Sequence, residues 1–227
     1  MKINNQFRFK DCFDKGDESR KVDFLVIHHT QAGSIEESVD LYKEHEVSAH
    51  YLINQGGEVF SLVQDCDVAY HSGVSNWNGV EGLNSASIGI ELICDDPFEI
   101  GYSSQQMDSL IELCKELKEK HGIQAQNIVG HSDIAYCADN GFLDRKQDPS
   151  HLFDWKKMAS EGMAVEIKGI DELLENIQSF VYGMRDVKIA EFKKACKEFG
   201  YKVSNLDDSF DDEMRDLVEV FERRFVR

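Results

Sequence analysis

The sequence predicts an α/β fold followed by a small helical C-terminal part. Segments with the pattern of strands and of amphipathic helices alternate up to Trp155, and from about Gly169 onward the chain is helix-rich and contains no proline. With 227 residues, 41% of them apolar and 30% charged, the composition is that of an ordinary globular protein. This length predicts one domain, or one domain with a small appendage.

The first clear element is a strand over residues 22–30, in which both faces are apolar until the two histidines at its end. Such a strand is typical of a sheet that is covered on both faces. Ser34 then begins a helix, with Glu37 placed to complete a capping box. The segments HYLI and EVFSLV, separated by NQGG, predict a hairpin over residues 50–63.

Three further elements follow in this first part. SIGIELI predicts a strand over residues 87–93. Apolar residues at helical spacing follow Ser103, which can cap a helix together with Gln106, and Gly122 stands at the expected C-terminal cap. The sequence pattern predicts a short strand over residues 127–130, directly before His131.

Three apolar stripes at helical spacing predict a C-terminal three-helix bundle. We expect Ser209 and Asp212 to form the capping box of the third helix. The predicted organisation is therefore a domain of residues 1–160 and a helical domain of residues 161–227. The stripes are Leu173, Ile177, Phe180 and Val181, then Ile189, Phe192, Cys196 and Phe199, then Met214, Leu217, Val218, Phe221 and Phe225.

Charge and composition exclude several classes of function. The net charge of −18 disfavours non-specific binding to nucleic acid and to an anionic membrane surface. No apolar run is long enough to span a bilayer, and the N-terminus has no hydrophobic leader segment. The expected location is thus the cytoplasm if the chain is complete, or the periplasm if a leader was removed. The six cysteines lack CxxC spacing, which favours reduced and mostly buried thiols.

His28, His131 and Asp148 are the candidate metal ligands. Two imidazoles and one carboxylate leave a fourth position open for water, as in a hydrolytic zinc site. Strand alternation leaves open whether His28 or its neighbour His29 faces the site, and each candidate alone could be purely structural. His131 follows a glycine that allows a sharp turn, and Ser132 or Asp133 could orient its ring.

Two further charged residues belong near these candidates. Pro149 holds Asp148 in an extended conformation, so Lys146, two residues earlier, should point to the same side. The alternative is an ordinary charged surface turn. Glu91 lies within the apolar SIGIELI strand, where a carboxylate needs either a structural salt bridge or a role as a general base with a raised pKa.

Six motifs in order resemble the zinc-dependent N-acetylmuramoyl-L-alanine amidases of the type-2 amidase family. They are LVIHHT, SAHYLI, AYHSGVSNWNG, SIGIEL, VGHSDIA and RKQDPSHLFDW, and the resemblance covers roughly residues 20–157. The family shares its fold with peptidoglycan recognition proteins. The resemblance therefore implies a central mixed sheet flanked by helices, and peptidoglycan or muropeptide as substrate.

The resemblance also implies roles for individual residues. It identifies His28 as the zinc ligand and places His29 where the family has tyrosine, while His131 and Asp148 complete the ligands of one Zn²⁺ per chain. It matches Glu91 to the catalytic glutamate and Lys146 to the catalytic lysine. The positions that shape the substrate groove are His50, His71 and Trp77, and Arg145 is a candidate for binding the carboxylates of the stem peptide.

The implied reaction is hydrolysis of the amide between N-acetylmuramic or 1,6-anhydro-muramic acid and L-alanine. Two alternatives stay open: a non-catalytic peptidoglycan-binding protein with the same fold, and a zinc peptidase of different bond specificity. The C-terminal bundle resembles the three-helix peptidoglycan-binding module of some family members, with a plain structural appendage as its competitor. Preference for intact or anhydro substrates and oligomeric state are not determined by the sequence.

The chain departs from the family at two places. The segment YCADNGFLD is inserted before RKQDP, and Ser150 and His151 replace the usual glycine after the proline. We expect these changes to alter loop shape and substrate access without loss of the metal. His151 is a further candidate ligand, although the family's ligand set is complete without it.

Overall fold

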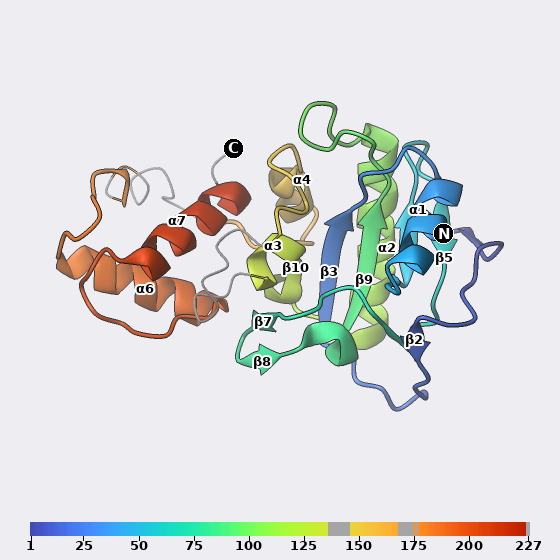
Figure 1. Ribbon diagram of the computed structural model, residues 1–227, viewed down its shortest axis with the longest axis horizontal. Coiled ribbons are helices and arrows are strands. Elements are labelled where there is room, and N and C mark those ends of the chain that lie inside the picture. Colours follow the sequence, from blue (N-terminus) through green and yellow to red (C-terminus); the bar gives the residue numbers. More distant parts are fainter. Residues whose placement is uncertain (136–145, 168–174, 176, 226–227) are drawn as a thin grey trace.

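The computed structural model describes residues 1–135, 146–167, 175 and 177–225. Its centre is a six-stranded sheet with the strand order β1-β5-β4-β9-β3-β10 (Figure 1). Only β4 and β5 run antiparallel to each other, so the sheet is mixed, as expected. The strands are β1 (Ile3–Asn4), β3 (Phe24–His29), β4 (Tyr51–Ile53), β5 (Val59–Ser61), β9 (Ser87–Leu92) and β10 (Ile128–Gly130).

Two small antiparallel pairs lie outside this sheet. One joins β2 (Phe13–Asp14) to β6 (Val68–Ala69), and the other joins β7 (Asn76–Trp77) to β8 (Val80–Glu81). The described helices are α1 (Ile35–Glu44), α2 (Ser104–His121), α3 (His131–Ile134), α4 (Trp155–Ser160), α6 (Val187–Phe199) and α7 (Asp212–Phe225), with 3-10 turns η1 (Leu83–Ala86) and η2 (Ala125–Asn127).

The helix caps agree with the sequence at Ser34, Ser103 and Gly122 and differ from it at Glu37 and Gln106. The side chains of Ser34 and Ser103 accept hydrogen bonds from the first turns of α1 and α2, and Gly122 ends α2 in the left-handed conformation with φ 71°. The carboxylate of Glu37 accepts from the Gly33 backbone N–H rather than from that of Ser34. Gln106 is buried and donates to the carbonyl oxygens of Ile53 in β4 and of Ile93 just after β9, so it joins α2 to the sheet and does not act as a cap.

The two faces of the sheet bury different partners. Leu25 and Ile27 of β3 share a core cluster with α2, whereas Phe24 and Val26 point the other way and share a cluster with α6 and α7. α1 packs with β4 and β5 in a third cluster. Because alternate residues of a strand point to opposite faces, His28 lies on the same face as Phe24 and Val26.

The helices α6 and α7 confirm two of the three helices expected in the C-terminal part, and they lie beside α3 and β10 (Figure 1). The first expected helix falls largely on residues outside the described part. Asp211, and not Ser209, caps α7, since its carboxylate accepts from the Met214 N–H. Lys193 is fully buried in α6, where its ammonium group lies 2.8 Å from Asp207 and 3.3 Å from Asp211.

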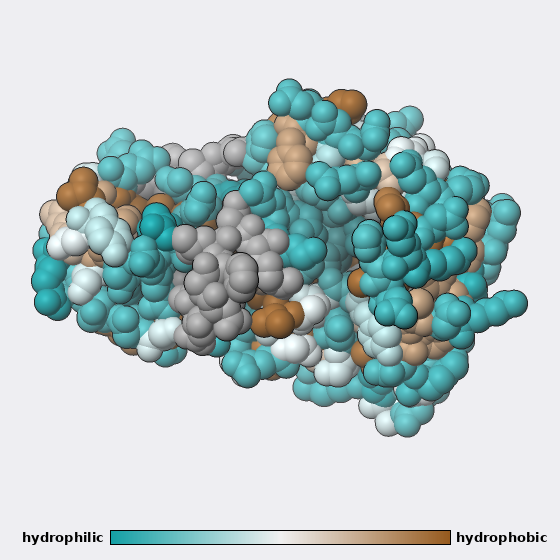
Figure 2. Space-filling model, in the orientation of Figure 1, coloured by the Kyte–Doolittle hydropathy of each residue, from teal (hydrophilic) through white to brown (hydrophobic). Residues whose placement is uncertain are grey.

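The visible surface is mainly hydrophilic, and its hydrophobic patches are small and scattered (Figure 2). Among the helices that the structure describes, none has the length and apolar character needed to cross a bilayer. The five described cysteines are free thiols, and three of them are buried.

Candidate active site

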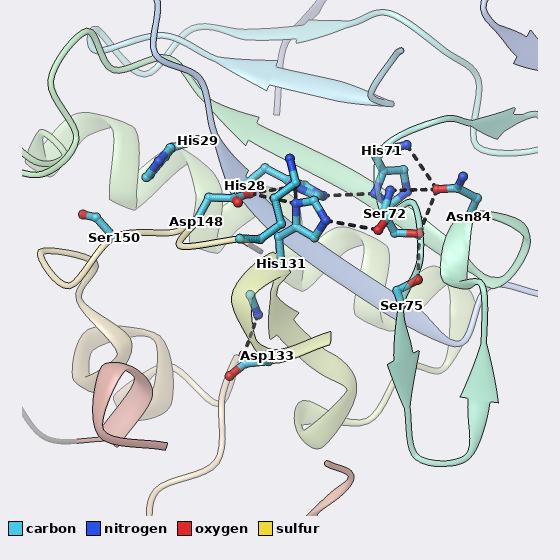
Figure 3. Close-up of polar contacts among 12 residues, drawn as sticks. His28, His29, His71, Ser72, Ser75, Asn84, His131, Asp133, Asp148 and Ser150 are labelled. Carbon is cyan, nitrogen blue, oxygen red and sulfur yellow. Dashed lines mark hydrogen bonds and ion pairs between the residues drawn. The ribbon is translucent and has the colours of Figure 1, made fainter. Parts of the chain in front are cut away.

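The three candidate metal ligands meet at the carboxyl ends of two parallel strands. His28 lies near the end of β3, and His131 directly follows β10 as the first residue of α3. The Nδ1 atoms of the two rings are 3.0 Å apart, and Asp148 Oδ2 lies 3.0 Å from His28 Nδ1 and 3.1 Å from His131 Nδ1 (Figure 3). Such strand ends are a common location for sites in α/β proteins.

This triangle fits a zinc ion. In a tetrahedral site with bonds of 2.0–2.1 Å, ligand atoms are about 3.3 Å apart, close to the separations seen among His28, His131 and Asp148. Burial lowers the pKa of His28 to about 4, so its ring is neutral near pH 7, as a ligand must be. In the part of the chain that the structure describes, these three residues form the one group of three or more histidine, cysteine, aspartate or glutamate side chains that lie close enough together to share a metal ion.

Gly130 brings Asp148 close to His131. Its backbone has an ordinary extended conformation, so the glycine is not needed for the sharp turn that the sequence suggested. A Cβ atom at this position would lie 2.7 Å from Cδ of Pro149. The Ser132 N–H also donates to the Asp148 carbonyl oxygen at 2.7 Å, which joins the start of α3 to the segment that carries the third ligand.

Neither of the other two candidate histidines joins the triad. His29 points to the opposite face of β3 and forms a 2.7 Å hydrogen bond with the Tyr102 hydroxyl. The ring of His151 lies against Phe98, with centroids 6.3 Å apart. The geometry thus agrees with His28 as the ligand.

Glu91 is the neighbour of His28 across the sheet. The two residues are paired in the register of β3 and β9. No lysine or arginine of the described residues forms a salt bridge with Glu91, and its Oε2 atom is buried without a hydrogen-bond partner. Burial, and after it the Asp148 carboxylate, raises the pKa of Glu91 to about 8. These features favour the general-base interpretation over the structural salt bridge.

A cleft of about 520 Å³ connects these groups. His28, Glu91 and Lys146 line it together, and Lys146 is in the same short segment as Asp148. Tyr42 of α1, which the sequence analysis did not single out, lines the cleft as well, and its buried hydroxyl lies near Glu91 without a hydrogen-bond partner among the described residues. The cleft therefore presents a cation, a carboxyl group and the candidate metal ligands to one substrate.

The structure corrects the expected roles of His50 and Trp77. His50 is fully buried: its Nδ1 accepts from the Gly89 N–H at 3.0 Å and its Nε2 lies 3.2 Å from the Asp67 carbonyl oxygen. Trp77 is also fully buried, and its ring packs against Tyr201 with centroids 4.8 Å apart. Both side chains hold the fold together and are not accessible to a substrate.

The remaining expectations for this region have different outcomes. His71 lines the cleft, although both of its ring nitrogens already have partners. Arg145 and the inserted segment before it lie outside the described residues. The expectation for Ser132 and Asp133 was wrong, because the second ring nitrogen of His131 lies 3.1 Å from the Ser72 carbonyl oxygen.

Asp133 instead binds the C-terminal part of the chain. Its carboxylate accepts hydrogen bonds from the Gly130 N–H at 2.7 Å and from the Tyr201 hydroxyl at 2.9 Å, and it forms a buried ion pair with Arg224 of α7. The Arg224 guanidinium also lies 4.1 Å from the centre of the Trp155 ring. The strand end that presents His131 is thus attached directly to α7.

Comparison with known proteins agrees with this arrangement. The model of the N-acetylmuramoyl-L-alanine amidase family Amidase_2 matches residues 18–151, which is more than half of the chain. The chain belongs to this family. The matched range contains every one of the candidate ligands together with Glu91 and Lys146.

Relatives of this amidase-family chain include two enzymes of Escherichia coli. AmiD is 32% identical over 157 residues, which cover 63% of this chain and 54% of AmiD. AmpD, a 1,6-anhydro-N-acetylmuramyl-L-alanine amidase, is 39% identical over 111 residues, which cover 49% of this chain and 56% of AmpD. The chain therefore spans about half the length of the curated relatives it matches.

Solved structures of the family have the same fold. The complex of Escherichia coli AmiD with anhydro-N-acetylmuramic acid-L-Ala-D-γ-Glu-L-Lys superimposes with a TM-score of 0.71 at 25% identity, covering 93% of this chain and 84% of AmiD. Pseudomonas aeruginosa AmpDh3 in complex with anhydromuramic pentapeptide superimposes with a TM-score of 0.72 at 27% identity, covering 98% of this chain and 88% of AmpDh3. A structure of AmpD covers only 70% of this chain, so the likeness to AmiD and AmpDh3 extends further along it.

Proposed function

We propose that this protein is a zinc-dependent N-acetylmuramoyl-L-alanine amidase. The observation that carries the proposal is the meeting of His28, His131 and Asp148 within 3.1 Å of one another, with Glu91 beside His28 on the next strand. Membership of the Amidase_2 family supports the choice of bond, which is the amide between the lactyl group of muramic acid and L-alanine.

In this proposal His28, His131 and Asp148 hold one zinc ion. A bound zinc ion supplies a Lewis acid that polarises a carbonyl group and makes water more acidic. The two imidazoles and the carboxylate keep one position open for substrate or water. The cleft beside them places the scissile amide next to Glu91 and Lys146.

Glu91 acts as the general base and then as the general acid. It accepts a proton from the attacking water and passes that proton to the departing amine of L-alanine. The apolar surroundings that raise its pKa to about 8 suit both steps, because the carboxyl group can then exchange a proton near neutral pH. Lys146 places a positive charge where the oxyanion of the tetrahedral intermediate develops.

The relatives indicate which substrates to try first. AmiD and AmpDh3 have solved structures in complex with anhydromuramyl peptides. We propose that the present protein cleaves the same class of compound, and that intact muropeptides are the second substrate class.

The test is digestion of defined muropeptides. Purified protein loaded with zinc is incubated with anhydro-N-acetylmuramic acid-L-Ala-D-γ-Glu-L-Lys and, separately, with the intact muropeptide, and the products are analysed by mass spectrometry. We expect release of the free peptide with L-alanine at its N-terminus, and we expect the Glu91→Gln variant to release almost none. Binding of both compounds without cleavage would instead identify a non-catalytic peptidoglycan-binding protein, and fragments cut elsewhere would identify a different hydrolase.

We further propose that residues 1–160 contain the catalytic site and that residues 161–227 complete its hydrophobic core. The shared cluster of Phe24 and Val26 with α6 and α7 supports this division of roles. Glycan binding by the helical part is a separate prediction. Co-sedimentation of the zinc-free protein with peptidoglycan sacculi tests it. If the protein stays in the supernatant, the helical part does not bind glycan and has a structural role alone.

A further inference from the structure

Residues 71–72 lie against the outer nitrogen atoms of both candidate metal-ligating histidines. His71 Nδ1 is 3.0 Å from His28 Nε2, and the carbonyl oxygen of Ser72 is 3.1 Å from His131 Nε2 (Figure 3). A single dipeptide thus contacts the two rings from the side opposite to the metal position. Outer partners of this kind fix the orientation and the tautomer of a metal-ligating histidine.

The tautomer of His131 follows from its partner. A carbonyl oxygen can only accept a hydrogen bond, so His131 Nε2 carries the proton and donates it to Ser72. In a neutral ring the other nitrogen, Nδ1, then holds a free lone pair. That atom faces Asp148 and His28.

The tautomer of His28 follows from a longer chain of hydrogen bonds. The Ser87 hydroxyl donates to the Leu83 carbonyl oxygen at 2.7 Å, so its oxygen accepts from His71 Nε2 at 3.2 Å. His71 Nδ1 is therefore the acceptor of its ring, and His28 Nε2 donates to it. His28 Nδ1 is left with a lone pair directed at the same point as that of His131.

Both tautomers therefore favour a cation between the rings. Two nitrogen lone pairs and the Asp148 carboxylate oxygen face one another at 3.0–3.1 Å. In these neutral tautomers none of the three acceptors can donate a hydrogen bond to another, whereas one metal cation between them satisfies all three. The outer hydrogen bonds thus determine which nitrogen of each ring is available to a metal.

Asn84 holds the dipeptide in place. Its Oδ1 atom accepts from the backbone N–H of His71 at 3.1 Å, from the N–H of Ser72 at 2.8 Å and from the Ser72 hydroxyl at 2.8 Å. Asn84 belongs to the turn η1, which Arg20 anchors by donating to the Asn84 carbonyl oxygen at 2.9 Å. One amide oxygen therefore fixes the backbone that orients both rings.

Gly89 of β9 is the second support. A Cβ atom at this position would lie 2.5 Å from the ring of His71, so only glycine lets that ring lie flat on the strand. The absence of a side chain at this position is therefore what allows the ring to lie where it contacts both His28 and Ser87.

We propose that Asn84 is a positioning residue for the zinc site, acting through His71 and Ser72 on both metal-ligating histidines. Asn84 is neither a candidate ligand nor part of the lining of the cleft. The inference rests on the proposed zinc-dependent function. It predicts that zinc affinity depends on a side chain that contacts neither the metal nor the substrate.

The experiment measures zinc affinity directly, by competition with a chromogenic chelator. We expect the Asn84→Ala variant to bind zinc on the order of 10-fold more weakly than the wild type, and His71→Phe on the order of 10- to 100-fold more weakly. The visible absorption spectrum of the cobalt-substituted protein should change in both variants, because the ligand geometry around the metal changes. Equal zinc affinity in wild type and Asn84→Ala would overturn the inference.

Two matched variants serve as controls. Asn84→Asp keeps an oxygen acceptor at the same place and should retain most of the zinc affinity. Asn127→Ala removes another asparagine that bonds to the backbone, here to the Asp23 carbonyl oxygen at 3.1 Å, and should leave zinc affinity unchanged. Unfolding temperatures in the presence of EDTA show whether each variant folds.

The design separates this inference from the proposed function. A wild-type protein that binds no zinc, or binds zinc without cleaving muropeptides, contradicts the proposed function itself. A wild type that does both, with unaltered zinc affinity in Asn84→Ala, contradicts only the role of Asn84. If Asn84→Ala does not fold, Asn84→Ser takes its place: the serine side chain is too short to reach the backbone of residues 71–72, so zinc affinity should again fall, and an unaltered affinity would overturn the inference.

Discussion

His28 and Glu91 occupy paired positions on the adjacent parallel strands β3 and β9. Paired residues of neighbouring strands point to the same face, so the sheet itself places the candidate ligand beside the proposed base. His131 follows β10 on the other side of β3. Three of the five groups of the proposed site are therefore positioned by strand ends, which are more rigid than loops.

Removal of the carboxylate ligand should abolish metal binding. We expect the Asp148→Ala variant to contain far less than stoichiometric zinc after dialysis and to have activity close to background, because two neutral imidazoles alone make an incomplete site. Metal analysis of the purified protein measures this. Asp154→Ala is the control, since Asp154 only caps α4 and should leave the zinc content unchanged. Full zinc occupancy in Asp148→Ala would rule out its role as a ligand.

Replacement of Glu91 by glutamine should separate catalysis from metal binding. We expect kcat to fall roughly 10²- to 10⁴-fold, which is the usual contribution of a general base. The zinc content should stay the same, because Glu91 is outside the ligand triangle. Steady-state kinetics and metal analysis on the same sample measure both. A variant with normal kcat would exclude Glu91 as the base.

The same substitution should change how stability depends on pH in the zinc-free protein. Burial raises the folded-state pKa of Glu91 to about 8, above its value of about 4.3 in an unfolded chain. Between these two values the folded state holds one more proton than the unfolded state, so wild-type stability decreases as pH rises, by at most about 1.4 kcal/mol per pH unit from this group. Urea unfolding in EDTA at pH 5 and pH 8 should show that Glu91→Gln gains stability relative to wild type at the higher pH. If the unfolding free energies of Glu91→Gln and wild type differ by the same amount at pH 5 and at pH 8, the raised pKa of Glu91 is contradicted.

The buried ion pair between Arg224 and Asp133 should be important for stability. Arg224→Ala leaves the Asp133 carboxylate buried without its cation, and loss of one partner of such a pair typically costs about 3–5 kcal/mol. Arg185→Ala is the matched control, because the pair of Arg185 with Asp208 is exposed and should contribute no more than about 1 kcal/mol. Urea unfolding measures the loss of unfolding free energy in both variants. Equal losses would show that the buried ion pair stabilises the fold no more than the exposed one.

Trp77 should affect stability and not substrate binding. Its ring is fully buried against Tyr201, so Trp77→Ala should cost about 3–5 kcal/mol of unfolding free energy. Measured at low temperature, where the variant stays folded, KM for the muropeptide should match that of the wild type. A raised KM with unchanged stability would show instead that Trp77 contributes to substrate binding.

The sequence predicted those features that depend on local pattern. The alternation of apolar residues located β3 and β9, and the caps located α1 and α2, because these signals lie within one element. The motif order pointed to His28, His131 and Asp148 as candidate ligands, and the structure brings these three side chains together. His50 and Trp77 were misjudged because their burial results from contacts with Asp67, Gly89 and the C-terminal helices, which lie far away in the sequence.

The residues that contact the outer ring nitrogens of the candidate ligands could not be predicted from the sequence either. Nothing in the spacing of Ser72 and Asn84 indicates that they lie behind the two histidines, since this follows from the packing of residues 71–84 against distant segments of the chain. Gly130 and Gly89 were visible as glycines, but the side chains that come close to them belong to distant segments. Such contacts are properties of the tertiary structure alone.

The buried attachment of Arg224 to Asp133 limits how this protein can evolve and be engineered. A binding module on a flexible tether can be exchanged for another by recombination, because only the tether is disturbed. Here α7 contributes a charged group to the strand end that presents His131. The helical part therefore has to be inherited together with the catalytic part, and a chimera that replaces it needs a new cation for Asp133 as well as a new cover for Phe24 and Val26.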